Sequence, residues 1–230
     1  MESIEDIPRI GNAYCSNVEI HCLPCFWFFH PGNKLECTCL AASSKVGIVV
    51  LVSSGAIAAG MGALGLDSKP KTLPEKQALA AIGQARLMEI YEEIFQVFNM
   101  KCSQILLNHD DFDDRHRLMN LNHTINALLN YGVVPIINEN DALAVDEIKV
   151  GDNDTLASLI VPLVEAQLLI LVSDIDGLYT GNPHTDPDAV LIHYVDKIDD
   201  TILSYAGDAV SGLGTGGMAT KLKAAQMVNA

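Results

Sequence analysis

The stretch Val46-Gly-Ile-Val-Val-Leu-Val52 runs directly into Ser53-Ser54-Gly55, and together they are the clearest guide to the fold. The seven uncharged, largely β-branched residues predict a strand that is buried on both faces. The Ser-Ser-Gly break ends that strand, and the alanine- and glycine-rich residues up to Leu66 then predict a helix. A strand, a polar turn and a helix in this order form the first half of a β-α-β unit.

A membrane span is the alternative for the same residues, because the 21 residues from Val46 to Leu66 carry no charge. Five glycines and the Ser-Ser-Gly break favour the strand and helix instead. The first residues of the chain are acidic and lack the basic-then-apolar order of a secretory signal. We therefore expect a cytoplasmic protein without a membrane partner.

Further β-α-β units follow along the chain. Apolar runs predict strands at 46–52, 102–107, 133–137 and 168–172, with shorter candidates at 148–150 and 191–195. Amphipathic stretches predict helices at 74–98, 114–130 and 155–165. The apolar positions of the first helix are Leu79, Ile82, Leu87, Ile90, Ile94 and Phe98. This alternation predicts an α/β fold, a three-layer sandwich in which helices cover both faces of a mainly parallel sheet.

The net charge of −15 restricts the ligands. A strongly acidic chain offers no basic footprint for nucleic acid or for an anionic lipid surface. We therefore expect small-molecule ligands and no nucleic-acid partner. Any bound phosphate must be held by local backbone N–H groups and a few placed lysines, because the overall field repels anions.

The cysteines cluster near the start of the chain. Five of the six precede Leu40, at Cys15, Cys22, Cys25, Cys37 and Cys39. A zinc knuckle is an open alternative, but Cys37-Thr-Cys39 has one intervening residue, where zinc sites usually have two to four. We expect reduced, unpaired thiols and no protein-held metal.

Polar residues come directly after the predicted strands. Ser53-Ser54-Gly55, Asn138-Glu-Asn-Asp141 and Ser173-Asp174 each follow one strand, and Gly151-Asp-Asn-Asp154 precedes a helix. Ligands of an open parallel sheet bind beyond the carboxyl ends of its strands, where loops converge and helices begin. Each segment alone could be a helix cap or an Asx-turn, but the four together predict one site.

The stretch Gly212-Leu-Gly-Thr-Gly-Gly-Met-Ala-Thr-Lys221 predicts a phosphate site. Its G-x-G-x-x-G pattern follows no strand and precedes no acidic ribose partner, and no lysine directly follows its last glycine, so neither a dinucleotide fingerprint nor a Walker A loop fits. Backbone N–H groups at a helix N-terminus, with Lys221 one turn in, can hold a phosphate. Met218, Leu222 and Ala225 form an apolar stripe, which argues against a flexible linker.

Phosphoryl transfer requires cations on the migrating group and carboxylates that position those cations or a metal ion. Lys221 supplies a cation at the predicted site. Asp154 or Asp174 supplies a carboxylate. The combination predicts a site for a nucleotide phosphate.

Five segments carry a family resemblance through their order and spacing. They are Val52-Ser-Ser-Gly-Ala-Ile-Ala-Ala-Gly60, Val134-Pro-Ile-Ile-Asn-Glu-Asn-Asp141, Lys149-Val-Gly-Asp-Asn-Asp154, Gly177-Leu-Tyr-Thr180 and residues 207–221. They resemble the amino-acid kinase family, and within it the branch that phosphorylates glutamate. The resemblance implies transfer of the ATP γ-phosphoryl group to the side-chain carboxylate of L-glutamate with Mg²⁺, giving γ-glutamyl phosphate, the first step of proline biosynthesis. It also implies a homo-oligomer.

The resemblance implies roles for single residues. The expected glutamate contacts are Ser54, Asn138, Asp141 and Asn153. The expected nucleotide contacts are Ser173, Asp174, Thr215, Gly216, Gly217, Met218, Ala219, Thr220 and Lys221. Lys221 is expected on the transferring phosphoryl group, and Asp154 is expected to orient the catalytic lysines.

Both ends of the chain depart from the family pattern. The family opens with a strand and a Lys-x-Gly loop, but the only lysine before Lys45 is Lys34, and no Gly/Ser loop follows it. The chain stops at Ala230, before the family's closing strand and the PUA-type domain of many members. We therefore expect residues 1–45 to be an atypical segment rich in cysteine and aromatic residues, and residues 46–230 to form an incomplete kinase domain with little or no turnover.

Two alternatives to a glutamate-phosphorylating enzyme stay open at this stage. The chain could bind ATP or glutamate without transferring phosphate. It could also be a kinase of the same superfamily that acts on another acid or on a nucleotide. Asn138–Asp141 with Gly151–Asp154 argues against the second alternative.

Overall fold

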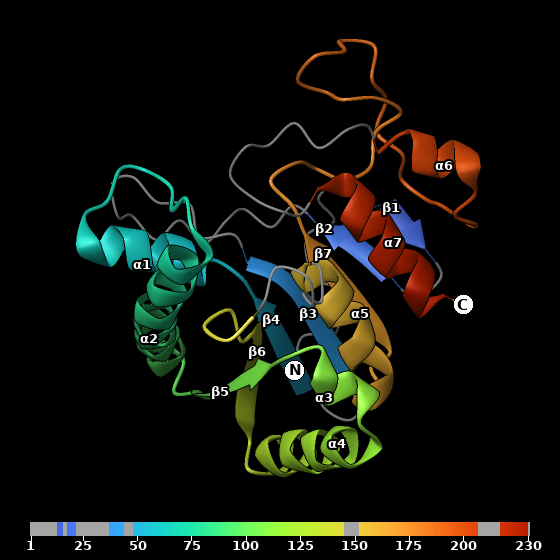
Figure 1. The fold of residues 1–230 in the computed structure, drawn as a ribbon. Coiled ribbons are helices and arrows are strands. Elements are labelled where there is room, and N and C mark those ends of the chain that lie inside the picture. The colour runs from blue at the N-terminus through green and yellow to red at the C-terminus, as the bar shows by residue number, and fades with distance from the viewer. Residues whose placement is uncertain are drawn as a thin grey trace.

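The structure is a computed structural model that describes residues 13–15, 18–21, 37–43, 48–144, 152–206 and 217–229. Within these ranges, strands form one sheet in the order β1-β2-β7-β3-β4-β6-β5 (Figure 1). The strands are β1 (Ala13–Cys15), β2 (Val18–His21), β3 (Cys37–Ser43), β4 (Ile48–Ser53), β5 (Lys101–Leu107), β6 (Val133–Glu139) and β7 (Leu168–Val172).

The sheet is mixed. The pairs β2–β7, β4–β6 and β5–β6 are parallel, whereas β3 is antiparallel to both β4 and β7 and β1 is antiparallel to β2. Leu40 of β3 lies opposite Leu51 of β4 on one side and Ile170 of β7 on the other. Because both neighbours oppose β3, β4 and β7 run in the same direction. The carboxyl ends of β4, β6 and β7 therefore lie at one edge of the sheet.

Helices cover both faces of the sheet. They are α1 (Ala56–Leu64), α2 (Leu73–Val97), α3 (Asp110–Asp113), α4 (Arg115–Asn130), α5 (Asn153–Leu163), α6 (Asp200–Ser204) and α7 (Met218–Val228). Figure 1 shows α1 and α2 on one side of the sheet and α4, α5 and α7 on the other. The predicted α/β fold with three layers is confirmed.

The side chains of β4 alternate between two hydrophobic clusters, one on each face of the sheet. Val50 and Val52 pack into a cluster that also contains Ile125 of α4, Leu156 of α5 and Leu222 of α7. The residue between them, Leu51, packs on the opposite face with Leu87 and Tyr91 of α2 and with Ile136 of β6. Successive strand residues point to opposite faces, so one short apolar run supplies both layers.

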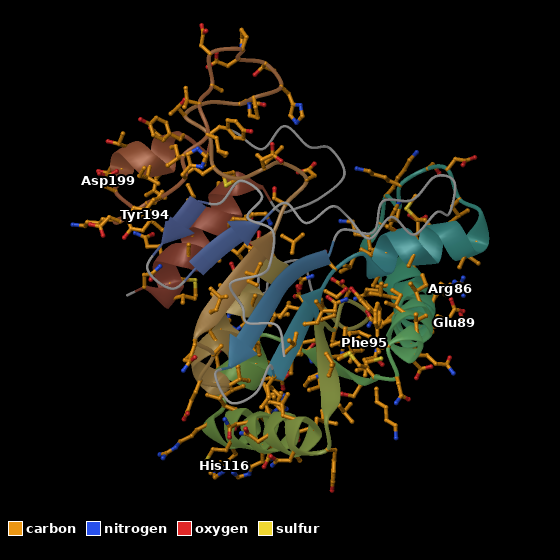
Figure 2. All side chains as sticks on the ribbon, turned by 180° about the vertical axis from the view of Figure 1, so that it is seen from behind. Arg86, Glu89, Phe95, His116, Tyr194 and Asp199 are labelled. Carbon is orange, nitrogen blue, oxygen red and sulfur yellow. The ribbon has the colours of Figure 1, made fainter. Side chains whose placement is uncertain are left out.

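The orientation of α2 differs in part from the sequence prediction. Its buried residues are Leu79, Ala80, Gly83, Gln84, Leu87 and Tyr91. Ile82 and Phe98, which the pattern placed on the apolar face, are 40% and 60% exposed. Figure 2 shows Arg86 and Glu89 on the outer face of this helix, away from Phe95, which packs against the smaller core.

Helices α2, α4, α5 and α6 begin at an acidic or hydroxyl N-cap residue. Asp114 accepts hydrogen bonds from the backbone N–H groups of His116 and Arg117 at the start of α4, at 2.8 and 3.0 Å. These bonds favour the charged carboxylate, and the pKa of Asp114 lies below its usual value because of them. Asp152 caps α5 in the same way, because its side chain accepts from the N–H of Thr155. The cap alternative is therefore correct for Asp152.

Most predicted elements are present with small shifts at their ends. The four longer predicted strands correspond to β4, β5, β6 and β7, and the three predicted helices correspond to α2, α4 and α5. The predicted strand at 191–195 is wrong, because these residues form only isolated bridges, among them the one from Leu191 to Tyr179. The candidate strand at 148–150 lies outside the described residues. The uncharged run after Val46 divides into β4 and α1, and no helix in the described part of the chain is both long and apolar enough to cross a membrane.

Candidate active site

The ends of three parallel strands bring the predicted polar segments to one edge. Val52 lies opposite Ile137, so Ser53 at the end of β4 lies beside Asn138 near the end of β6. Ser173 and Asp174 follow β7, whose carboxyl end faces the same way. The topology thus places these segments at one edge of the sheet, as expected for an α/β binding site.

A buried ion pair joins the beginnings of α5 and α7. The Lys221 ammonium lies 3.0 Å from Oδ1 and 3.3 Å from Oδ2 of Asp154. Asp154 is 1% exposed and Lys221 is 8% exposed. The Thr220 hydroxyl also donates to Oδ2 of Asp154, at 2.6 Å. Asp154 therefore anchors two consecutive residues of α7, and it fixes where the Lys221 cation lies.

Helix α7 begins at a glycine, which has no side chain to cap the backbone N–H groups of the first turn. Gly217 is the N-cap in extended backbone, and its N–H donates to the Thr220 hydroxyl at 3.0 Å. Met218 and Ala219 occupy the first turn, where backbone N–H groups have no partner within the helix. These donors and the Lys221 ammonium suit a phosphate group. Thr220 was expected to contact nucleotide, but here its side chain also supports Asp154.

A second polar network connects Asn153, Ser53 and Asn138. The Asn153 side-chain amide donates to the Ser53 carbonyl at 2.8 Å and to Oδ1 of Asn138 at 3.2 Å. Asn138 is 1% exposed, and its Oδ1 also accepts from the Glu139 N–H at 2.8 Å. Asn153 and Asp154 are adjacent, so the first turn of α5 joins this network to the Lys221 pair.

Two residues of α2 complete the network and were missed by the sequence analysis. Gln84 accepts from the Asn138 side-chain amide at 2.9 Å. The Tyr91 hydroxyl lies 2.8 Å from the Ser53 hydroxyl. Both residues lie on the buried face of α2 with Leu87 between them. Polar side chains at positions i and i+7, in line with a buried leucine, are the signal that could have identified them.

We expect Tyr91→Phe to lower the free energy of unfolding by about 1 kcal/mol, because the buried Ser53 hydroxyl loses a partner. Urea denaturation of the variant and of wild type measures this difference. In a double-mutant cycle with Ser53→Ala, the two effects should be clearly non-additive. Additive effects, or a Tyr91→Phe protein as stable as wild type, would show that this hydrogen bond contributes nothing.

A cavity of about 310 Å³ opens between α2 and the ends of β5 and β6. Its polar lining consists of Gln84, Gln104, Glu139, Asn140 and Asp141, and its apolar lining includes alanines of α1 and α2. The predicted substrate residue Asp141 thus borders a cavity. Ser54 lies between β4 and α1, immediately before Gly55, whose φ of 99° lies in the left-handed region that favours glycine.

The structure unites the predicted residues only in part. Asn138, Asn153, Asp154, Thr220 and Lys221 belong to the two joined networks. Ser173 accepts from the N–H of Ile175 at 3.4 Å, and Asp174 is exposed, so the described contacts do not connect either residue to Asp154. Thr215, Gly216 and Gly151 lie outside the described residues.

The residues fit a nucleotide phosphate better than a protein-held metal. In the described ranges, no three His, Cys, Asp or Glu side chains are grouped so that they could hold a metal ion. The cysteine pairs that suggested zinc lie where the structure describes no side chains. Mg²⁺ commonly reaches such sites bound to phosphates and water, with one or two carboxylates from the protein. Asp174, exposed at the edge where β7 ends, is a carboxylate of that kind.

Comparison with known proteins identifies the class of fold and site. The sequence profile of the amino acid kinase family matches residues 37–229, so the chain belongs to that family. The chain is 55% identical over 180 residues to the glutamate 5-kinase of Citrifermentans bemidjiense, covering 78% of this chain and 48% of that protein. It is 58% identical over 179 residues to the glutamate 5-kinase of Clostridium tetani, covering 78% of this chain and 67% of that protein. The chain spans about half the length of most of the curated relatives it matches.

Proposed function

We propose that this chain is the core of a kinase that transfers the γ-phosphoryl group of ATP to the side-chain carboxylate of L-glutamate. The observation that carries the proposal is the Asp154–Lys221 pair at the N-terminus of α7, linked through Asn153 to Asn138 at the end of β6. In this arrangement, Lys221 is the cation proposed to bind phosphate, and the side-chain amides of Asn153 and Asn138 are the groups proposed to bind glutamate. They lie on adjacent ends of helices and a strand. The named relatives support the choice of glutamate as acceptor.

The proposed reaction needs positioning and charge neutralisation rather than a covalent intermediate. One side-chain carboxylate oxygen of glutamate forms a bond to the γ-phosphorus as the bond from that phosphorus to the β–γ bridging oxygen breaks. ADP leaves with that oxygen. Lys221, held by Asp154, neutralises charge on the transferring group, and the N–H groups of Met218 and Ala219 bind phosphate oxygens. Mg²⁺, when bound to the nucleotide, supplies further charge neutralisation at the phosphates.

The acceptor would lie between the cavity and the Asn153 network. In this proposal Ser54, Asn138, Asp141 and Asn153 contact glutamate, and Asp141 provides a carboxylate for its ammonium group. Ser173 and Asp174, with residues 215–221, contact the nucleotide. We also propose that residues 46–230 are the kinase domain, that the protein acts in the cytoplasm in proline biosynthesis, and that copies of the chain associate. β5 is at the end of the described sheet, which leaves its outer edge available for pairing.

The test is a ligand and acceptor comparison on the full chain. ADP release is measured with ATP and Mg²⁺ in the presence of glutamate, aspartate or uridylate, and thermal unfolding is measured with each ligand. Glutamate-dependent ADP release is the expected result, at a low rate because residues 1–45 contain no Lys-x-Gly loop. Stabilisation by ATP and glutamate without ADP release would replace this proposal with a binding-only protein. Preference for aspartate or uridylate would refute the substrate assignment.

A further inference from the structure

Gln84 is the only residue of α2 whose side chain is bonded to Asn138 in the described contacts, and no part of the proposed chemistry uses it. It is 7% exposed, and its Oε1 accepts from the Asn138 amide at 2.9 Å. Its own Nε2 is buried and has no hydrogen-bond partner among the described residues. A buried donor without a partner destabilises a protein. A glutamine at this buried position therefore requires an explanation, and the hydrogen bond that its Oε1 accepts from Asn138 offers one.

The direction of each amide in the network follows from one backbone group. The N–H of Glu139 can only donate, and it donates to the Asn138 side chain, so that acceptor is Oδ1 and the other end is the amide NH₂. The Asn138 NH₂ therefore needs an acceptor, which Gln84 supplies. With Oδ1 fixed in this direction, Asn153 must present its own NH₂ to it. The same NH₂ reaches the Ser53 carbonyl.

We propose that Gln84 is a positioning residue for the acceptor site, acting through Asn138 on the orientation of the Asn153 side chain. Without an acceptor at position 84, the buried Asn138 NH₂ loses its partner, and the Asn138 side chain must shift to regain one. A full rotation of the amide does not help, because it would set the NH₂ against two donors, the Glu139 N–H and the Asn153 NH₂. That shift would move Oδ1 of Asn138 away from the Asn153 NH₂ and weaken their bond. Asn153 precedes Asp154 directly, so its orientation also affects the turn that holds Lys221. This inference rests on the proposed function for its ligand.

Two substitutions at the same position separate orientation from packing. Gln84→Met has a similar shape but offers only a weak thioether acceptor in place of the amide oxygen. Gln84→Glu keeps an acceptor oxygen in either protonation state and replaces the NH₂ group that has no partner with a second carboxyl oxygen. We expect Gln84→Met to weaken L-glutamate binding about tenfold with little change for ATP, and Gln84→Glu to restore most of the affinity. Ile94→Ala, a partly buried position on the same helix, should lower the melting temperature without changing glutamate affinity.

The measurements are glutamate and ATP dissociation constants by calorimetry and the side-chain amide signals of ¹⁵N-labelled asparagine, assigned with Asn138→Asp and Asn153→Asp. Gln84→Met should shift the Asn153 amide signals, while Gln84→Glu and Ile94→Ala should leave them close to wild type. Unchanged Asn153 signals in Gln84→Met, or equal losses of glutamate affinity in Gln84→Met and Ile94→Ala, would overturn the inference. If wild type binds no glutamate, the proposed function fails, and the asparagine signals alone still decide the role of Gln84.

Discussion

Replacing Asp154 with alanine is expected to lower the free energy of unfolding by about 3–5 kcal/mol, because the buried Lys221 ammonium loses its counter-charge. Asp154 is 1% exposed and also accepts from Thr220, so two side chains each lose a hydrogen bond. This loss is a large part of the roughly 5–15 kcal/mol that stabilises a typical domain. Urea denaturation followed by circular dichroism measures it directly.

A double variant tests whether the unpaired charge is the cause. Asp154→Ala with Lys221→Met removes both charges and keeps an unbranched apolar chain at position 221, so most of the lost stability should return. Asp154→Asn alone keeps the shape of the side chain but not its charge, and it should fall between wild type and Asp154→Ala. If the double variant is no more stable than Asp154→Ala, then lost packing or the lost Thr220 bond explains the effect instead.

The same pair separates stability from activity. If the wild-type chain has measurable activity, Lys221→Met alone should lower its kcat at least about 100-fold. Removal of one well-placed donor to a charge that develops in the transition state commonly lowers kcat by that factor. The double variant should regain stability but not activity. That outcome would show that the activity needs Lys221 itself and not only the stability that the ion pair provides.

The sequence predicted those strands of the sheet whose own residue pattern is enough to indicate a strand. Short apolar runs bounded by polar turns predicted β4, β5, β6 and β7. β4 and β6 are buried along most of their length, whereas β5, at the end of the described sheet, has only Leu107 buried. The sequence failed for β3, Cys-Thr-Cys-Leu-Ala-Ala-Ser, since alanine and serine have low strand propensity. β3 is a strand because it pairs with β4 on one side and β7 on the other, and such pairing between distant segments is not visible locally.

The candidate site also contains residues that the sequence predicted and residues that it did not. Asp154 and Lys221 were both expected at the site, and the structure brings their charged atoms within 3.0 Å. Gln84 and Tyr91 were not expected, because the sequence pattern of α2 was assigned from its apolar residues alone. Whether these two residues face solvent or Asn138 and Ser53 depends on how α2 rotates against the sheet. That rotation is set by a close contact between α1 and α2, which the sequence shows only as two glycines, Gly60 and Gly83.

Substituting Gly83 with alanine is expected to destabilise the protein by about 1–3 kcal/mol or more, although alanine is the better helix former by about 1 kcal/mol. A Cβ atom at position 83 would lie 1.7 Å from the carbonyl oxygen of Ala56 and 2.3 Å from the backbone nitrogen of Gly60. These are backbone atoms of α1, so the whole helix must move away. α1 begins directly after Ser54 and Gly55, so its displacement should also weaken glutamate binding in the proposed site.

Two further variants isolate this helix contact from helix propensity. Gly60→Ala places a Cβ atom 2.0 Å from the carbonyl oxygen of Leu79, in the same contact but on the other helix, and should lower the melting temperature similarly. Ala78→Gly makes the reverse change at an exposed position of α2 and should cost only about 1 kcal/mol. Because one separation between α1 and α2 relieves both clashes, Gly60→Ala with Gly83→Ala should lose less stability than the sum of the single losses. A Gly83→Ala protein more stable than wild type, with unchanged ligand affinity, would show that α1 and α2 do not touch as closely as the structure places them.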